Sequence, residues 1–182
     1  MNRGLKRIDD LIERSLTEVR LRIDSRVYPV RVDLLQMVDQ ILVTAELEAQ
    51  AKNQILEVQI EPNLTAIADQ HLLYSAVSNL IQNALKFTHV GGKIQIRGKK
   101  AGETIAIEVE DECGGLSNDL VDLFKPFEQQ NENRKGLGLG LTIARRAALL
   151  NKGTIEVSNI PGKGCIFKIT LPEKTMGSDP TH

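Results

Sequence analysis

The chain has 182 residues, 41% hydrophobic and 26% charged, a composition typical of a globular protein that folds around one core. Lys and Arg number 23 against 24 acidic residues, so a net charge of -1 provides no general basic field for nucleic acid or anionic lipid. Aromatic residues make up 3% and Trp is absent, which argues against a base-stacking surface. No run approaches the ~18 apolar residues of a membrane span, and the charged start does not resemble a signal peptide. We therefore expect a cytoplasmic chain that contacts neither nucleic acid nor membrane.

The first predicted element is an amphipathic helix. Apolar residues recur at spacings of three and four from Leu5 to Ile23, with charged residues between them, so this helix needs a partner. Pro29 then favours an edge strand, which indicates a domain boundary near residue 26. Asp33 is placed to cap a second helix, whose apolar residues from Leu34 to Ala45 have helical spacing.

Strands and a further helix are expected in the middle of the chain. Apolar and polar residues alternate from Leu56 to Ile60, as they do in a half-buried strand. Asp69 is placed to cap a helix that runs to about Thr88 with one apolar side. Two alternating segments between residues 94 and 109 flank a turn at Gly102 and predict a hairpin.

The last third of the chain begins with a long irregular segment. Residues Asp111 to Gly140 are polar and glycine-rich, with at most one short helix, and such segments inside compact domains are usually functional, so we interpret this one as a lid. A helix from Leu141 to Leu150 and two strands, 154–158 and 165–171, follow. The predicted fold is α+β: a two-layer α/β sandwich with a mixed sheet of about five strands plus a short edge hairpin, covered on one face by three helices.

One helix carries a polar stripe, defined as Asn79, Asn83 and Lys86. Their positions i, i+4 and i+7 lie on one narrow face, opposite the apolar residues. An amide oxygen can ligate Mg²⁺ and an ammonium group can neutralise phosphate oxygens, so the stripe suits a metal-bound nucleotide. A solvated helix face is the alternative for the stripe taken alone.

Two other segments point to the same kind of ligand. Asp111 follows a strand and precedes Cys113–Gly115, and its carboxylate can accept a hydrogen bond from an exocyclic amine such as that of adenine. Taken alone, it is more often a turn aspartate. GLGLGL at 136–141 opens a helix, where backbone amides can meet a polyphosphate, although a glycine hinge is its ordinary explanation. It matches neither the lysine-bearing P-loop nor GxGxxG.

The order of the motifs gives a family resemblance. The stretch from about Tyr28 to Pro172 resembles the histidine kinase branch of the superfamily that also contains gyrase, the ninety-kilodalton heat-shock chaperone and mismatch-repair ATPases. The first 21 residues resemble the second helix of the kinase dimerisation hairpin. The motifs that carry the main resemblance occur in the order NLIQNALKFT, DECGGL, FKPF, GLGLGL and GKGCIF.

This resemblance implies an ATP site with Mg²⁺. It implies catalytic roles for Asn83 as the Mg²⁺ ligand and Lys86 as a phosphate contact, an adenine wall at Phe87 and an adenine-reading acid at Asp111. The other nucleotide contacts that we expect are Asn79, Gly115, Leu116, Phe127, Arg134, Lys135, Gly136, Leu137, Gly138, Leu139, Gly140 and Leu141, with the segment Phe124 to Phe127 as a lid anchor.

The resemblance also implies a division of the chain and two partners. Residues 1–25 would be a remnant of the dimerisation helix, 26–174 the ATP-binding kinase domain and 175–182 a disordered tail. No His-Glu or His-Asp motif precedes the N-terminal helix, and we expect His71 and His89 to be solvated surface residues rather than phosphate acceptors. The acceptor histidine is therefore expected on a dimerisation hairpin outside this chain, and a response regulator receiver domain would act downstream. The parent protein could be anchored in a membrane.

Three features of the chain bear on these expectations. Cys113 stands at the first glycine of the family's Asp-x-Gly-x-Gly, so the backbone there can differ; Cys165, where the family often has Thr, is expected in the core. We interpret both cysteines as free thiols, with a single disulfide as the alternative. Asn79 replaces the water-activating glutamate of gyrase-type ATPases, which favours transfer over the alternative of an ATP-hydrolysing clamp. A catalytically silent nucleotide-binding scaffold is the third possibility.

Overall fold

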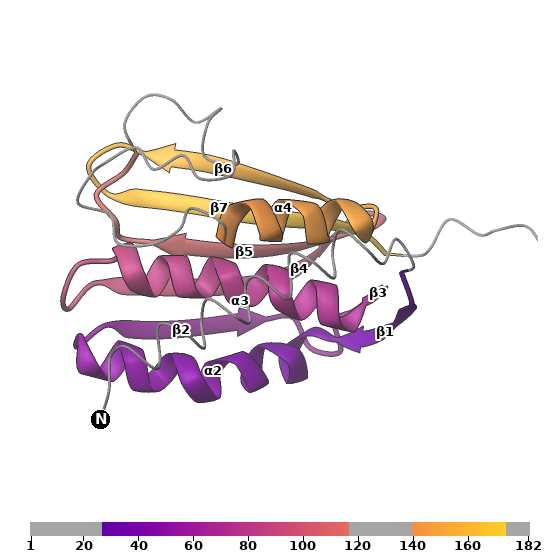
Figure 1. Ribbon diagram of the computed structural model, residues 1–182, viewed down its shortest axis with the longest axis horizontal. Coiled ribbons are helices and arrows are strands. Elements are labelled where there is room, and N and C mark those ends of the chain that lie inside the picture. The colour runs from indigo at the N-terminus through magenta and orange to yellow at the C-terminus, as the bar shows by residue number, and fades with distance from the viewer. Residues whose placement is uncertain (1–26, 117–139, 174–182) are drawn as a thin grey trace, which may run out of the picture.

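The protein is described by a computed structural model over residues 27–116 and 140–173. Two layers are visible in Figure 1, a sheet and a set of helices packed across one face of it. The helices are α2 (Leu34–Ala51), α3 (Gln70–Phe87) and α4 (Gly140–Leu150), and the strands are β1 (Pro29–Asp33), β2 (Ile55–Ile60), β3 (Thr65–Asp69), β4 (Lys93–Ala101), β5 (Thr104–Asp111), β6 (Thr154–Ile160) and β7 (Gly164–Pro172).

The main sheet has five strands in the order β2-β4-β5-β7-β6. β2 pairs with β4 in parallel, and the other neighbours pair antiparallel, so the sheet is mixed as predicted. The expected short edge pair is also present, as an antiparallel sheet of β1 and β3. It is not a hairpin of consecutive strands, because α2 and β2 lie between its two members in the chain.

The core lies between the sheet and the helices. α3 occupies the middle of the helical layer in Figure 1, and its apolar side, which includes Ala76, Leu80 and Ile81, is fully buried. From the sheet, residues such as Ile96 and Ile107 are equally buried and belong to the same cluster. Burial of apolar surface at about 25 cal/mol per Å² is what holds the two layers together. The predicted two-layer α/β sandwich with three helices is therefore confirmed.

Side-chain caps fix where the two longer helices begin, as the sequence predicted. Asp33 accepts a hydrogen bond from the backbone N–H of Gln36 at 2.9 Å at the start of α2. Asp69 accepts from the N–H groups of His71 and Leu72, both at 3.1 Å, at the start of α3. Each cap satisfies donors that have no partner inside the helix.

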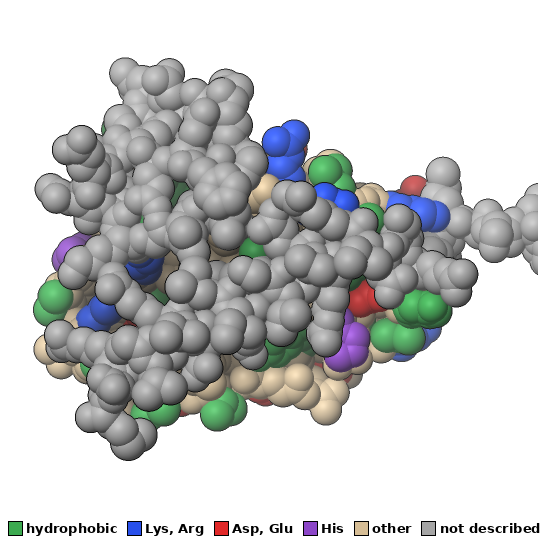
Figure 2. Space-filling model, viewed as in Figure 1, with side chains coloured by type: hydrophobic (Ala, Val, Ile, Leu, Met, Phe, Trp, Pro, Cys, Tyr) green, Lys and Arg blue, Asp and Glu red, His purple; other side chains and the backbone are tan. Residues whose placement is uncertain are grey.

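The surface of the described part is mixed in character. Figure 2 shows basic, acidic and apolar side chains interspersed around the rim of the helical face. None of the helices in residues 27–116 and 140–173 is long and apolar enough to cross a membrane. The predicted N-terminal helix and the C-terminal tail lie outside the described residues, so the boundaries expected at 25 and 174 stay predictions.

Candidate nucleotide site

The polar stripe of α3 lies along the border of the buried helix face. Asn79, Asn83 and Lys86 are each half-buried, whereas Leu80 and Ala84 beside them are buried completely or nearly so. The amide nitrogen of Asn79 donates to the carbonyl oxygen of Ser75 at 2.8 Å, which orients its amide oxygen away from the helix backbone. The arrangement presents amide groups and one ammonium group on a single side of α3, as the spacing predicted.

The first residue of α4 lies against the two asparagines of the stripe. A Cβ atom built on Gly140 would lie 3.0 Å from Oδ1 of Asn79 and 3.6 Å from both Oδ1 and Nδ2 of Asn83. Helix α4 begins at Gly140, one residue before the predicted start, and packs against α3. The fold therefore brings a glycine helix start and two amide side chains together from segments more than 50 residues apart in the chain.

Lys86 is the last residue of the polar stripe, and Phe87 follows it at the end of α3. The ammonium nitrogen of Lys86 lies 4.7 Å from the centre of the Phe87 ring, within the range of a cation–π interaction. Just beyond them, Thr88 ends the helix with its backbone N–H bonded to the carbonyl of Ala84. The Thr88 hydroxyl in turn accepts from the N–H of Glu112 at 3.4 Å, which connects the end of α3 to the loop after β5.

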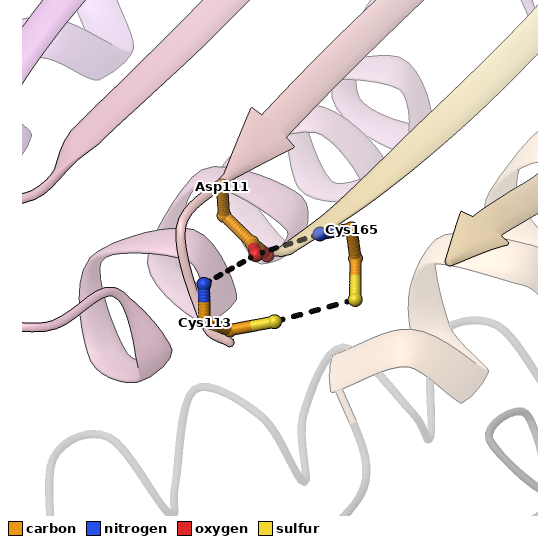
Figure 3. A group of neighbouring side chains, drawn as sticks. All are labelled: Asp111, Cys113 and Cys165. Atoms are coloured by element: carbon orange, nitrogen blue, oxygen red, sulfur yellow. Dashed lines mark hydrogen bonds between the residues drawn. The ribbon is translucent and has the colours of Figure 1, made fainter. Parts of the chain in front are cut away.

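Asp111 is the last residue of β5 and only 3% exposed. Its Oδ1 atom accepts backbone N–H bonds from Cys113 at 3.1 Å and from Cys165 at 3.2 Å (Figure 3). A carboxylate held by two backbone donors has a fixed orientation. Burial at a strand end, together with this anchoring, suits a residue that reads one polar group of a ligand.

The loop after Asp111 depends on glycine and on one asparagine of β6. Gly114 and Gly115 have φ values of 84° and 92°, in the left-handed region that glycine adopts without strain. The side chain of Asn159 accepts from the N–H of Leu116 at 2.8 Å and donates to its carbonyl at 3.0 Å. A Cβ atom built on Gly115 would lie 3.1 Å from Oδ1 of the same asparagine. Asn159 was not predicted, because a polar residue in an alternating strand carries no separate signal in the sequence.

The two cysteines meet beside Asp111. Their Sγ atoms are 3.3 Å apart, and both are free thiols, as we expected. Cys165 is fully buried, in agreement with a core position, while Cys113 is half-buried. Their proximity was not foreseen, because 52 residues separate them in the chain.

Of the other predicted residues, some lie in the described part of the chain and the rest lie outside it. His71 and His89 are exposed, as expected of solvated residues, with Nδ1 of His89 2.9 Å from the carbonyl oxygen of Glu112. Leu116 and Leu141 are half-buried and pack against the main core. Several predicted lid contacts lie outside the described residues: Phe127, Arg134, Lys135, Gly136, Leu137, Gly138 and Leu139, together with the anchor segment from Phe124.

Comparison with known families shows to which family the chain belongs. Residues 68–175 match the family model described as "Histidine kinase-, DNA gyrase B-, and HSP90-like ATPase". The chain belongs to this ATPase family. The matched range contains the polar stripe, Asp111 and Gly140, so the family assignment covers all three parts of the site.

Relatives with curated names narrow the assignment within the ATPase family. The sensor histidine kinase TmoS of Ectopseudomonas mendocina is 34% identical over 78% of this chain and 15% of its own length. The signal transduction histidine-protein kinase AfsQ2 of Streptomyces coelicolor is 33% identical over 92% of this chain and 31% of its own length. The chain thus spans less than a third of the length of these two proteins. It is an ATP-binding catalytic domain related to those of sensor histidine kinases.

Solved structures show the same fold. The histidine kinase AdeS of Acinetobacter baumannii superposes with a TM-score of 0.78 at 24% identity, over 94% of this chain and 81% of that one. Full-length ShkA superposes with a TM-score of 0.80 at 24% identity, over 93% of this chain and 36% of that one. The mixed sheet covered by three helices is therefore the architecture of a histidine kinase catalytic domain.

Proposed function

We propose that this domain binds Mg-ATP between α3 and α4 and transfers the γ-phosphoryl group to a histidine on a separate dimerisation hairpin. The observation that carries the proposal is the close approach of Gly140 to Asn79 and Asn83, where a Cβ atom would be crowded and where the start of α4 lies beside two amide side chains. Helix N-termini bind phosphate through free backbone N–H groups, and here such an end adjoins two amides. ShkA, of the same fold, was determined in complex with AMPPNP, which supports an adenine nucleotide as the ligand.

The residues present fit the Mg²⁺ ion that the resemblance implies. Mg²⁺ prefers oxygen ligands and keeps several waters, so one amide oxygen from Asn83 together with phosphate oxygens is a sufficient set. When bound, the ion neutralises charge that develops on the phosphates. Lys86 would add a positive charge at the phosphates, and Asp111 would accept a hydrogen bond from the adenine amine.

The proposed reaction moves one phosphoryl group between two partners. A ring nitrogen of the acceptor histidine forms a bond to the γ-phosphorus while the bond from that phosphorus to the β,γ-bridging oxygen breaks, and ADP leaves. The domain contributes position and charge, because this chemistry needs little else from the protein. Asn79 disfavours hydrolysis as an alternative, since its amide cannot take a proton from water and already donates to Ser75.

The proposed partners follow from the same reaction. The acceptor would come from a hairpin that residues 1–25 partly resemble, with 26–174 as the nucleotide-binding unit and 175–182 as a tail. ThkA, another histidine kinase of this fold, was solved in complex with the response regulator TrrA, and we propose a receiver domain of that kind as the next recipient. The domain would act in the cytoplasm, whether or not its parent protein is membrane-anchored.

Phosphoryl transfer is tested with γ-labelled ATP. The chain is incubated alone and with a purified hairpin fragment from a related kinase, and the label is analysed for stability in acid and in alkali. We expect no label on this chain and slow labelling of the hairpin, acid-labile and alkali-stable, because a separated pair lacks the effective concentration of a tethered one. Stable self-labelling, or fast ATP hydrolysis without transfer, would contradict the proposal.

Asn83 is tested in the same assay and by calorimetry. Asn83→Ala should abolish transfer and weaken Mg-ATP binding, yet bind ADP without Mg²⁺ as the parent does, because only the metal ligand is lost. Gln82→Ala is the matched control, since it removes an amide from the neighbouring position of α3, about 100° around the helix. Equal Mg-ATP affinity for Asn83→Ala and the parent would remove Asn83 from the metal site.

A further inference from the structure

The two cysteines of the chain form a closely spaced pair at the base-reading end of the candidate site. Cys113 lies in the loop after β5 and Cys165 is the second residue of β7, and Figure 3 shows their side chains directed toward each other. The sulfur atoms are 3.3 Å apart. The whole sequence contains no other cysteine, so an intramolecular disulfide can form only between these two.

Asp111 joins the two cysteines through the backbone. Its Oδ1 accepts the N–H of Cys113 and the N–H of Cys165, and its carboxylate lies with both sulfur atoms inside a group of 4.8 Å extent. Any movement of Cys113 relative to Cys165 therefore acts on the donors that orient this carboxylate. Under the proposed function, the same carboxylate reads adenine.

The two thiols differ in access and in acidity. Cys165 has no exposed surface, whereas Cys113 is half-buried and is the thiol that a small oxidant meets first. The hydrogen bond from Cys165 lowers the pKa of Cys113, and it outweighs both burial and the Asp111 carboxylate, which raise that pKa. The thiolate is the reactive form of cysteine, so this environment favours attack by Cys113.

We propose that Cys113 and Cys165 are a redox-modification site, which a peroxide converts to a disulfide and which thereby weakens adenine nucleotide binding; this inference rests on the proposed function. The Cys113 thiolate attacks one oxygen of hydrogen peroxide, the O–O bond breaks, and a sulfenic acid and hydroxide form. The Cys165 sulfur then attacks the sulfenic sulfur, and the S–O bond breaks. In sum, two thiols and one peroxide give one disulfide and two waters, with two electrons passing to the peroxide.

Closing the disulfide must move the loop that follows Asp111. A disulfide bond is ~2.05 Å long, so the sulfur atoms must approach by about 1.2 Å from their present separation. β7 is held on both sides, because Cys165 is in register with Asp111 of β5 and with Asn159 of β6. The shift therefore falls mainly on Cys113, and it disturbs the N–H that Cys113 donates to Asp111.

The test compares the reduced and peroxide-treated full chain. Both samples contain a chelator selective for transition metals over Mg²⁺. A metal ion bound by Asp111, Cys113 and Cys165 then cannot explain a difference in ADP affinity between them. Mass spectrometry after thiol blocking should show one intramolecular disulfide and no blocked cysteine in the treated chain. Calorimetric titration with ADP should show affinity about fivefold weaker, the size expected for one disturbed hydrogen bond, and reversed by dithiothreitol.

Two single substitutions serve as controls. Cys113→Ala and Cys165→Ala each remove one sulfur, and both should give ADP affinities that peroxide leaves unchanged; two variants are used because the buried Cys165 position can tolerate change poorly. Three results would overturn the proposal: free thiols after peroxide treatment, a disulfide without loss of ADP affinity, or the same loss in either variant. If the reduced parent fails to bind ADP, the proposed function fails, whereas the mass measurement still tests disulfide formation separately.

Discussion

Gly164 lies at the closest approach between the backbone of β7 and the end of β5. A Cβ atom built there would overlap the carbonyl group of Asp111 and would come within 3.0 Å of the Cα of Glu112. Backbone atoms cannot move aside as a flexible side chain does, so a larger residue must displace one of the two strands. Because Asp111 is the proposed base-reading residue, this glycine sets the geometry of the site without contacting a ligand.

Replacing Gly164 should therefore cost far more than replacing a glycine in open space. We expect Gly164→Ala to lower the free energy of unfolding by about 3 kcal/mol, as overpacking against backbone does. Gly91→Ala is the matched control: Gly91 has a φ of 78° and nothing within 4 Å of its built Cβ, so only conformational strain of about 1 kcal/mol applies. Urea unfolding of the three proteins measures both values, and similar losses for the two variants would contradict the overlap at Gly164.

At the scale of elements, the start of α3 is a junction of three segments. Oδ1 of Asp69 caps α3, and its Oδ2 accepts the N–H of Tyr28 at 3.1 Å, next to the start of β1. The N–H of Asp69 donates to Oδ1 of Asn151, just past the end of α4, at 2.6 Å. One residue therefore fixes the relative positions of the helix that carries the polar stripe, the helix that begins at Gly140 and the small sheet.

Removing this cap should destabilise the protein more than removing the simpler cap of α2. Asp69 is only 9% exposed, and Asp69→Ala leaves three backbone N–H groups without the carboxylate that accepts from them. We therefore expect the free energy of unfolding to fall by about 2 kcal/mol. Asp33→Ala loses one exposed bond, from the N–H of Gln36, and should cost about 1 kcal/mol or less. Thermal and urea unfolding of both variants give the comparison. An equal or larger effect for Asp33→Ala would show that the Asp69 junction contributes nothing beyond a cap.

For the whole molecule, the sequence predicted those helices and strands whose own residues carry a cap, a helical spacing or an alternation. The starts of α2 and α3 followed from Asp33 and Asp69 next to apolar residues at helical spacing, and the β4–β5 hairpin from alternation around Gly102. Strand β3 was not predicted, because five residues with little alternation become a strand only through pairing with β1, across α2 and β2. Long-range pairing of that kind leaves no periodic trace in the sequence.

The candidate site shows the same division. Spacing alone placed Asn79, Asn83 and Lys86 on one side of α3, and the order of motifs suggested that Gly140 would join them, as its contact with both asparagines now supports. The hydrogen bonds of Asn159 to Leu116 and the approach of Cys113 to Cys165 could not be predicted. Both depend on the pairing of β5 with β7, which are far apart in the chain, and such pairing leaves no local signal in the sequence.

A charged network joins two inner strands of the sheet, β4 and β5, to the turn before β7. Arg97 of β4 donates to Glu108 at 3.1 Å and to Glu110 at 2.8 Å, both on β5, and Lys163 donates to the other oxygen of Glu110 at 2.8 Å. Glu110 directly precedes Asp111, and Lys163 directly precedes Gly164. The network therefore joins the turn before β7 to the end of β5, where Asp111 must be held.

This network should make stability depend on pH in the acid range. The hydrogen bond from Lys163, ahead of that from Arg97, holds the pKa of Glu110 below its ordinary value of 4.5 and outweighs burial, which raises it. A carboxylate whose pKa is lowered in the folded state adds stability above its unfolded pKa, and this stability is lost as the pH falls through the folded pKa. We expect Lys163→Met to lower the free energy of unfolding at pH 7 only slightly, since Lys163 is largely exposed and water screens its charge. The difference in stability between Lys163→Met and the parent should shrink as the pH is lowered from about 5 to 3.

Urea unfolding at a series of pH values measures this difference, with Lys152→Met as a control at another exposed lysine. A difference that stays constant at every pH would show that Lys163 acts through packing rather than through the charge of Glu110.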